Sequence, residues 1–300
     1  MKTLKEKNRI HRSLADRTFN IVNNVVLAFL AFIMLYPFWD MAVMSISPLA
    51  FANKSGLKLW PLGGVTAEAY QQVFATPLVL TAYKNTIIRT LVGTSISIVL
   101  YFCAAYPLGK KELPFRRTLS LFFLIPMFFT GGMVPEYLVY KEIGIYNTIW
   151  ALILPSLMTT YNLLIVRNFV AGLPDSLEES ARVDGASFAV ILFQIIIPLS
   201  MPVLATVALW VAVAHWNAWY DATVYVRGKD LIVLQKYLRD LLITAKEAAA
   251  GGDSVSGGEA IATRSVEAAT TLVAIGPILI TYPFIQRYFV KGVMVGSVKG

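Results

Sequence analysis

The chain has 300 residues, of which 57% are hydrophobic and only 15% are charged, and its mean hydropathy is +0.63. A soluble domain of this size cannot bury so much apolar surface, which argues for a protein whose helices cross a membrane. The formal charge of +8 falls largely beside apolar runs, so it indicates membrane topology and not nucleic-acid binding. The single cysteine, Cys103, argues against a disulfide scaffold, and unbroken apolar runs argue against a transmembrane β-barrel.

The N-terminal segment is basic and leads directly into an apolar run. Residues 1–20 contain six lysines and arginines and are predicted to be a cytoplasmic segment. The run that follows is too long for the apolar core of a signal peptide, which predicts an uncleaved first span. Residues 21–300 are then expected to form one all-α membrane domain. Its six predicted transmembrane helices are 21–46, 83–108, 118–136, 147–170, 189–214 and 266–286.

The basic residues predict how these helices are oriented. The N-terminal segment and residues 109–117 are rich in lysine and arginine, whereas the short loop 135–146 holds only Lys141. By the positive-inside rule, both termini are expected in the cytoplasm, with a long outer loop at 215–265. Within that loop, residues 248–258 read as a flexible glycine- and serine-rich connector. No GxxxxGK[ST] sequence occurs, so this chain is not expected to bind a nucleotide.

Most of the predicted spans contain proline or glycine. Each proline removes one backbone hydrogen bond, which a membrane helix tolerates where neighbouring helices or water satisfy the freed carbonyl. Two interpretations remain open: ordinary kinked helices, or kinks that shape a pathway through the membrane. In the third and fourth spans these residues are Pro126, Gly131, Gly132 and Pro155.

A polar segment, 172–190, interrupts the apolar sequence between the fourth and fifth spans. Asp175 is predicted to cap a short helix, with Glu178 reaching back to its amide in a capping box. Glu178 also precedes Arg182 by four residues, the favourable order for an ion pair, and Gly185 is predicted to end the helix. The expected apolar side consists of Leu177, Ala181 and Val183.

Two roles fit this short helix. It is either a capped connector or a docking element that inserts small side chains into a cleft of a cytoplasmic partner. Docking requires a close approach of the two backbones, which small residues permit. The small residues here are Ser180, Ala181, Gly185 and Ala186.

The spacing within this segment resembles a known motif. Glu179-Ser-Ala is followed after three residues by Gly185, and after nine more by Ile195-Ile-Ile-Pro198. This is similar to the EAA loop of ABC importer permeases, with Ser180 and Ile197 as conservative departures. The ending from Tyr282, YPFIQRYFVKG, resembles the second permease subunit of maltose-type carbohydrate importers, in the branch for polysaccharides and uronate oligosaccharides.

The resemblance implies a type I ABC importer permease, a multi-pass protein of the bacterial cell membrane. Such a chain pairs with a homologous permease and receives its substrate from an extracytoplasmic binding protein. Two separate ATP-binding subunits bind ATP and Mg²⁺, so this chain is expected to need no cofactor and to have no catalytic or metal site. The positions expected to couple to the ATPase are Glu178, Glu179, Ser180, Ala181, Asp184 and Gly185.

Aromatic and amide side chains gather after the fifth span. Trp216, Asn217 and Trp219 are predicted substrate contacts, because flat aromatic faces and hydrogen-bonding groups suit sugar rings. The alternative is that these tryptophans anchor the helix at the lipid headgroups. His215 has no companion residues for metal binding.

The second span carries two further candidates, Asn85 and Arg89. An intramembrane arginine has three open interpretations: it snorkels to the surface, it attracts an anionic sugar together with Lys84, or it pairs with Asp40. A secondary transporter and a membrane-embedded enzyme are the competing classes for the whole chain. No HExxH or GxSxG sequence supports an enzyme, and no carboxylate relay is evident for a secondary transporter.

Overall fold

The computed structural model describes residues 14–48, 56, 58–61, 63–250 and 264–280, and these ranges contain helices and no strand. The predicted all-α class is therefore confirmed for this part of the chain. The chain divides into two compact units, one formed by 1–70 with 255–269 and the other by 71–254 with 270–300. The C-terminal ending from Tyr282, which carries part of the family resemblance, lies outside the described residues.

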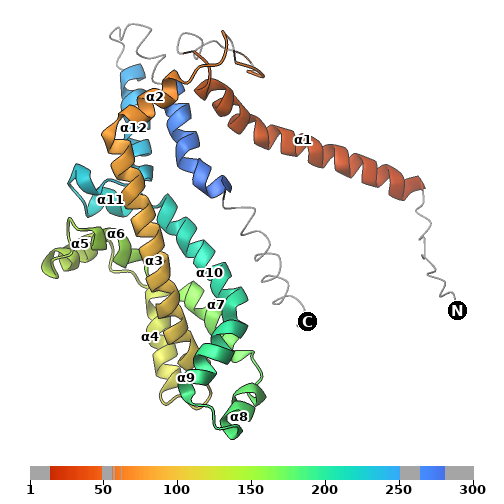
Figure 1. Cartoon of the computed structure of the whole chain (residues 1–300), viewed down its shortest axis with the longest axis vertical. Coiled ribbons are helices and arrows are strands. Elements are labelled where there is room, and N and C mark those ends of the chain that lie inside the picture. The colour runs from red at the N-terminus through yellow and green to blue at the C-terminus, as the bar shows by residue number, and fades with distance from the viewer. Residues whose placement is uncertain (1–13, 49–55, 57, 62, 251–263, 281–300) are drawn as a thin grey trace. The chain divides into compact units, whose positions relative to one another are not determined.

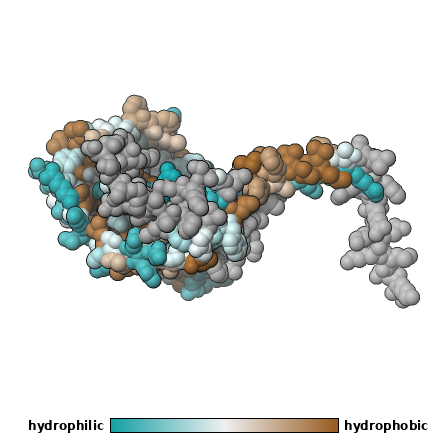
Figure 2. Space-filling view, turned by 90° about the horizontal axis from the view of Figure 1, so that it is seen from above, coloured by the Kyte–Doolittle hydropathy of each residue, from teal (hydrophilic) through white to brown (hydrophobic). Residues whose placement is uncertain are grey.

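The first unit contains helix α1, Leu14–Ser45, which covers the predicted first span. The mean hydropathy of its most apolar 18-residue stretch is 2.1, and large apolar side chains such as Phe19, Val25 and Phe32 are exposed. Figure 2 shows that apolar residues cover most of the visible surface of this helix. A helix that is apolar all round requires lipid or another protein around it.

The second unit is a bundle built around one long helix, α3, Pro77–Gly109 (Figure 1). Pro77 occupies the first turn, where its missing N–H has no intrahelical partner to lose. The other helices are α2 (Glu68–Ala75, whose first turn belongs to the first unit), α4 (Arg116–Phe128), α5 (Met133–Glu142), α6 (Ile149–Ile153), α7 (Thr160–Ala171), α8 (Ser176–Val183), α9 (Phe188–Val190), α10 (Ile197–Asn217), α11 (Tyr220–Val224), α12 (Leu234–Ala250) and a helix over 264–280, whose residues up to 269 belong to the first unit. The short turns are η2 (Leu154–Ser156), the π-helical η3 (Ile191–Ile196) and η4 (Lys229–Leu231).

Three helical stretches of the described residues are long and apolar enough to cross a membrane: Asp16–Ser45, Pro77–Gly109 and Phe188–Val224. Two bent helix pairs raise this number to five if each pair is one span. The predicted sixth span, 266–286, is helical up to residue 280, and its remainder lies outside the described residues.

The predicted third span, 118–136, is wrong as a single helix. Helices α4 and α5 meet at an angle of 116°, because α4 ends at the extended residue Phe129 and Gly132, with a positive φ of 81°, precedes α5. The predicted fourth span, 147–170, is also broken, with a bend of 52° between the η2 turn and α7. There Thr159 caps the new helix by accepting a hydrogen bond from the Asn162 amide at 3.4 Å.

The predicted outer loop, 215–265, contains more helix than expected. Helix α10 continues to Asn217, and α11, η4 and α12 follow before residue 250. The connector expected at 248–258 begins in the last turn of α12, and residues 251–263 lie outside the described part of the chain.

The core of the second unit lies where α3, α7 and α10 meet. Figure 1 shows α3 and α10 running side by side, with α8 at one end of the bundle and α11 and α12 toward the other. We call these ends the α8 end and the α12 end. Among the buried apolar side chains are Tyr101 and Ala105 from α3, Leu163 and Val166 from α7, and Val207 and Val211 from α10.

Candidate functional site

Helix α8 has the predicted length and the predicted end. It is 8 residues long, and Gly185 follows it with φ +78°, so the amide of Ala186 donates to the Ala181 carbonyl at 2.9 Å. This is the hydrogen bond that closes a helix with a left-handed glycine. The predicted ion pair is confirmed, since Arg182 Nη2 lies 3.8 Å from Glu178 Oε2.

The predicted capping box at the start of α8 is wrong. Asp175 already has helical backbone angles and its side chain caps nothing. Glu178 does not reach back to the Asp175 amide, because its carboxylate forms an ion pair with Lys110 and accepts a hydrogen bond from Tyr106 at 3.4 Å. The Glu178 carboxylate therefore binds Lys110 and Tyr106, which are distant in the sequence, and not the nearby Asp175 amide.

The predicted apolar side of α8 is also wrong. Val183 is 88% exposed and Leu177 is 39% exposed, whereas Ala181 is half-buried against the core. The side chain that α8 buries is the acidic Glu178. Of the other residues expected to couple to an ATPase, Glu179, Ser180, Asp184 and Gly185 are exposed. The α8 end therefore presents a polar, small-residue helix surface.

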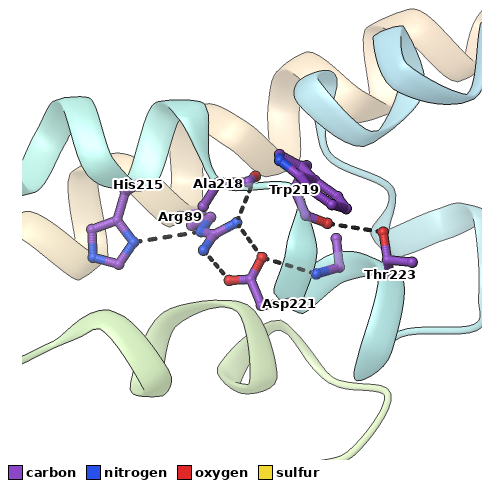
Figure 3. A network of polar contacts seen from close by, with 7 residues as sticks. Arg89, His215, Ala218, Trp219, Asp221 and Thr223 are labelled. Atoms are coloured by element: carbon purple, nitrogen blue, oxygen red, sulfur yellow. Dashed lines mark hydrogen bonds and ion pairs between the residues drawn. The ribbon is translucent and has the colours of Figure 1, made fainter. Parts of the chain in front are cut away.

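Arg89 is the centre of a buried polar cluster near the α12 end (Figure 3). It is fully buried and forms a two-pronged ion pair with Asp221, with Nη1 3.1 Å from Oδ1. Nη1 also donates to the Ala218 carbonyl at 3.1 Å, and Nε donates to His215 Nδ1 at 3.4 Å. Of the three interpretations left open for Arg89, snorkelling does not apply because this side chain is enclosed, and its acidic partner is Asp221 and not Asp40.

Asn85 connects α3 to the segment between α11 and α12. Its Nδ2 donates to the carbonyls of Asp230 and Ile232 at 2.7 and 2.9 Å. The neighbouring Thr86 accepts a hydrogen bond from the Leu234 amide at 2.9 Å, where α12 begins. Asn85 is buried, and the chain itself uses both of these donor bonds, so the structure gives this residue an architectural role in place of the predicted substrate contact.

Trp216 is likewise buried in the bundle. Its Nε1 donates to the Ala274 carbonyl at 3.1 Å, and its ring meets Tyr83 edge-on at 6.3 Å. The Tyr83 hydroxyl in turn donates to the Val273 carbonyl. Trp216 and Tyr83 therefore connect residues 270–280 to α10 and α3, so the ring of Trp216, one of the predicted substrate contacts, is used for packing within the bundle.

Asn217 and Trp219 differ from the other predicted substrate contacts. Asn217 is exposed, and Trp219 is half-buried. The guanidinium of Arg239, an exposed residue of α12, lies 3.7 Å from the centre of the Trp219 ring. Such a stack combines a flat aromatic group and a cation on one accessible surface.

A third set of contacts joins α5 and the loop between α5 and α6 to the segment after α11. The hydroxyl of Tyr225 donates to Glu136 Oε2 at 3.1 Å. Burial, and then this hydrogen bond to a carboxylate, raise the pKa of Tyr225 well above its ordinary value, so the phenol stays a neutral donor. Asn147, with a left-handed φ of 57°, accepts from the Arg227 amide at 3.0 Å.

Sequence reasoning missed Lys110, Asp221, Tyr106 and Gly93. Lys110 contributed only to the count of basic residues, and Asp221 was not singled out as a partner for Arg89. Gly93 lies where a Cβ atom would stand 2.4 Å from His215 Nε2, so it permits a close approach of α3 and α10. The signal for Asp221 was its charge in an apolar stretch, since a buried arginine requires an acidic partner.

The fold and these sites define a class: an all-α, multi-pass integral membrane protein with a polar helix displayed at one end of its bundle. A family model described as "Binding-protein-dependent transport system inner membrane component" matches residues 93–220, which include α8 and His215, the Arg89 partner on α10. Protein LplC of Bacillus subtilis (strain 168) is 37% identical over 295 residues, covering 98% of this chain and 99% of LplC.

Two further relatives are named for what they transport. The polygalacturonan/rhamnogalacturonan transport system permease protein YtcP of Bacillus subtilis (strain 168) is 33% identical, covering 96% of this chain and 100% of YtcP. A crystal structure of a bacterial ABC transporter involved in the import of the acidic polysaccharide alginate contains a similar chain. The TM-score is 0.83 at 32% identity, covering 93% of this chain and 99% of that one.

The chain belongs to the binding-protein-dependent inner membrane permeases, the translocating components of ABC transporters. It is a multi-pass protein of the inner membrane and a transport subunit, so the secondary-transporter and enzyme alternatives are set aside. As a component of this kind, it works with a binding protein and an ATPase.

Proposed function

We propose that the chain forms six transmembrane helices with both termini in the cytoplasm and pairs with a homologous permease. The pair would expose one site alternately to the two sides of the membrane, as two ATP-binding subunits bind and hydrolyse Mg²⁺–ATP. An extracytoplasmic binding protein would deliver the substrate. The positions of Lys110, Arg116 and Arg167 support this orientation, because these basic residues surround the α8 end of α3.

The observation that carries the docking role is the surface of α8. Its exposed residues include the carboxylate of Glu179 and the small Ser180, and the exposed Asp184 and Gly185 follow the helix. Small residues allow a partner's backbone to approach, and Glu179 is free to form a charge-assisted hydrogen bond to a basic group of the ATPase. The core behind Ala181 and Ala186 provides a rigid support for this contact.

We propose that the transported substrate is an oligosaccharide carrying uronate carboxylates. The printed names of YtcP and of the alginate transporter both concern acidic polysaccharides. Within this chain, Arg89 is neutralised by Asp221, whereas Arg239 on the ring of Trp219 is an accessible cation. Asn217, Trp219 and Arg239 are therefore the proposed contacts, through stacking and an ion pair.

Uptake of a uronate oligosaccharide by the reconstituted transporter tests this proposal. An oligogalacturonate should stimulate ATP hydrolysis in the presence of the binding protein, and a neutral arabino-oligosaccharide of equal length should not. Trp219→Ala should lower uptake roughly fivefold, because stacking contributes about 1 kcal/mol. Trp150→Ala removes another exposed tryptophan and should leave uptake unchanged. Equal stimulation by both sugars, with no effect of Trp219→Ala, would overturn the uronate assignment.

A further inference from the structure

The α8 end of α3 is a junction at which three basic side chains meet one helix terminus. The last carbonyls of a helix have no intrahelical partner and carry partial negative charge. Arg116 Nε and Arg167 Nε donate to the same carbonyl, that of Leu108, at 3.0 and 3.2 Å. Helices α4 and α7 are thereby fastened to the end of α3.

The third basic residue, Lys110, fastens α8. Its ammonium group pairs with Glu178 Oε1 and lies 5.3 Å from the centre of the Tyr106 ring. Tyr106 and Arg182 contact the other carboxylate oxygen, Oε2, at 3.4 and 3.8 Å. Both oxygens of Glu178 are therefore engaged by side chains of the chain itself.

Burial separates the roles of the two adjacent glutamates on α8. The Glu178 side chain is 7% exposed, while Glu179 is exposed to solvent. A carboxylate enclosed in this way is unavailable to another subunit, whereas its neighbour is free. The apolar contacts of α8 are few, since Leu177 and Val183 are both exposed. The ion pair therefore contributes much of what holds α8 in place.

We propose that Glu178 is a positioning residue that fixes α8 to the end of α3 through Lys110, so that the two helices move as one body. The inference rests on the proposed docking of α8 to the ATPase. It removes Glu178 from the predicted ATPase contacts and assigns Lys110, 68 residues earlier in the chain, to coupling. A rigid attachment lets a displacement of α8 reach α3, whose Asn85 and Arg89 hold the connections at the α12 end.

The test uses the complete transporter with its binding protein, and measures the ratio of substrate-stimulated to basal ATP hydrolysis. Lys110→Met should lower this ratio roughly tenfold, the effect of losing one hydrogen bond to a charged group. Lys110→Arg keeps the charge and should keep most of the ratio. The matched control, Lys111→Met, removes an exposed neighbouring lysine and should have no effect.

Exchanging the charges of Lys110 and Glu178 distinguishes a positioning role from a general loss of stability. Lys110→Glu combined with Glu178→Lys restores an ion pair of opposite sense, so it should recover most of the coupling that either change alone removes. If Lys110→Met prevents assembly of the transporter, recovery of assembly in the double variant supports the same inference. The positioning role would be overturned if the exchanged pair couples no better than the single variants. It would also be overturned if Lys110→Met leaves the ratio of stimulated to basal ATP hydrolysis unchanged.

A second arm keeps this result distinct from the docking proposal. A cysteine at Glu179 should form a cross-link to the ATPase whether or not Lys110 is present. If that cross-link forms and Lys110→Met leaves the ratio unchanged, the positioning role is wrong and docking stands. If the Glu179 cysteine forms no cross-link in the otherwise native chain, docking itself is wrong, and the positioning role falls with it.

Discussion

Replacing Asp221 with asparagine should destabilise the protein more than any other single change of charge in the described chain. The guanidinium of Arg89 is fully buried, and Asp221 is the one acidic side chain that contacts it among the residues described. Leaving a buried charge without its partner costs about 3 kcal/mol or more. The thermal unfolding midpoint of the purified transporter, measured at one heating rate, should fall markedly.

Asp240→Asn provides the matched control for this measurement. Asp240 pairs with Lys236 at 2.6 Å, but its side chain is 49% exposed, so the loss should be below about 1 kcal/mol. The double change Arg89→Met with Asp221→Leu removes both charges and should recover much of the stability, since an apolar pair often replaces a buried ion pair well. Equal midpoints for Asp221→Asn and Asp240→Asn would show that Arg89 is not enclosed as described.

Replacing Gly93 with alanine should also be strongly destabilising. The added Cβ would stand 2.4 Å from His215 Nε2, 2.7 Å from Cε1 and 2.9 Å from Cδ2. His215 is fully buried and accepts a hydrogen bond from Arg89, so its ring cannot simply turn away. Overpacking of this kind costs about 2 kcal/mol and should separate α3 from α10. The same unfolding midpoint measures the loss.

Gly276→Ala is the comparison for this change, because a Cβ at Gly276 meets nothing within 4 Å in its helix. It should leave the midpoint unchanged or raise it slightly, as alanine favours helix. Adding His215→Ala to Gly93→Ala removes the obstructing ring and should restore part of the loss. If Gly93→Ala behaves like Gly276→Ala, the two helices do not approach as closely as the structure indicates.

Local features of the fold were predictable from the sequence. The polar helix at 176–183, its ion pair between Glu178 and Arg182, and its end at Gly185 depend on residues a few positions apart. The composition and the apolar runs likewise indicated a membrane protein of helices. Each of these predictions uses only spacing and side-chain type, which a sequence displays directly.

The partners of buried polar groups were not predictable in this way. Arg89 and Asp221 are 132 residues apart, and Lys110 and Glu178 are 68 residues apart, so no spacing rule joins them. Trp216, Asn85 and Arg89 look like ligand-binding residues in the sequence because aromatic, amide and cationic groups bind sugars. The same groups also satisfy buried carbonyls and carboxylates, and only the packing of α3 against α10 decides which use applies.

The central claim is that the exposed surface of α8 is the contact with the ATPase. The most direct measurement is cross-linking from a cysteine at Glu179, with Cys103, the one native cysteine, changed to serine. In the assembled transporter this cysteine should cross-link to a cysteine placed in the surface cleft of the ATPase. A cysteine at Lys229, exposed near the α12 end, should form none. A cross-link from Lys229, or none from Glu179, would contradict the account.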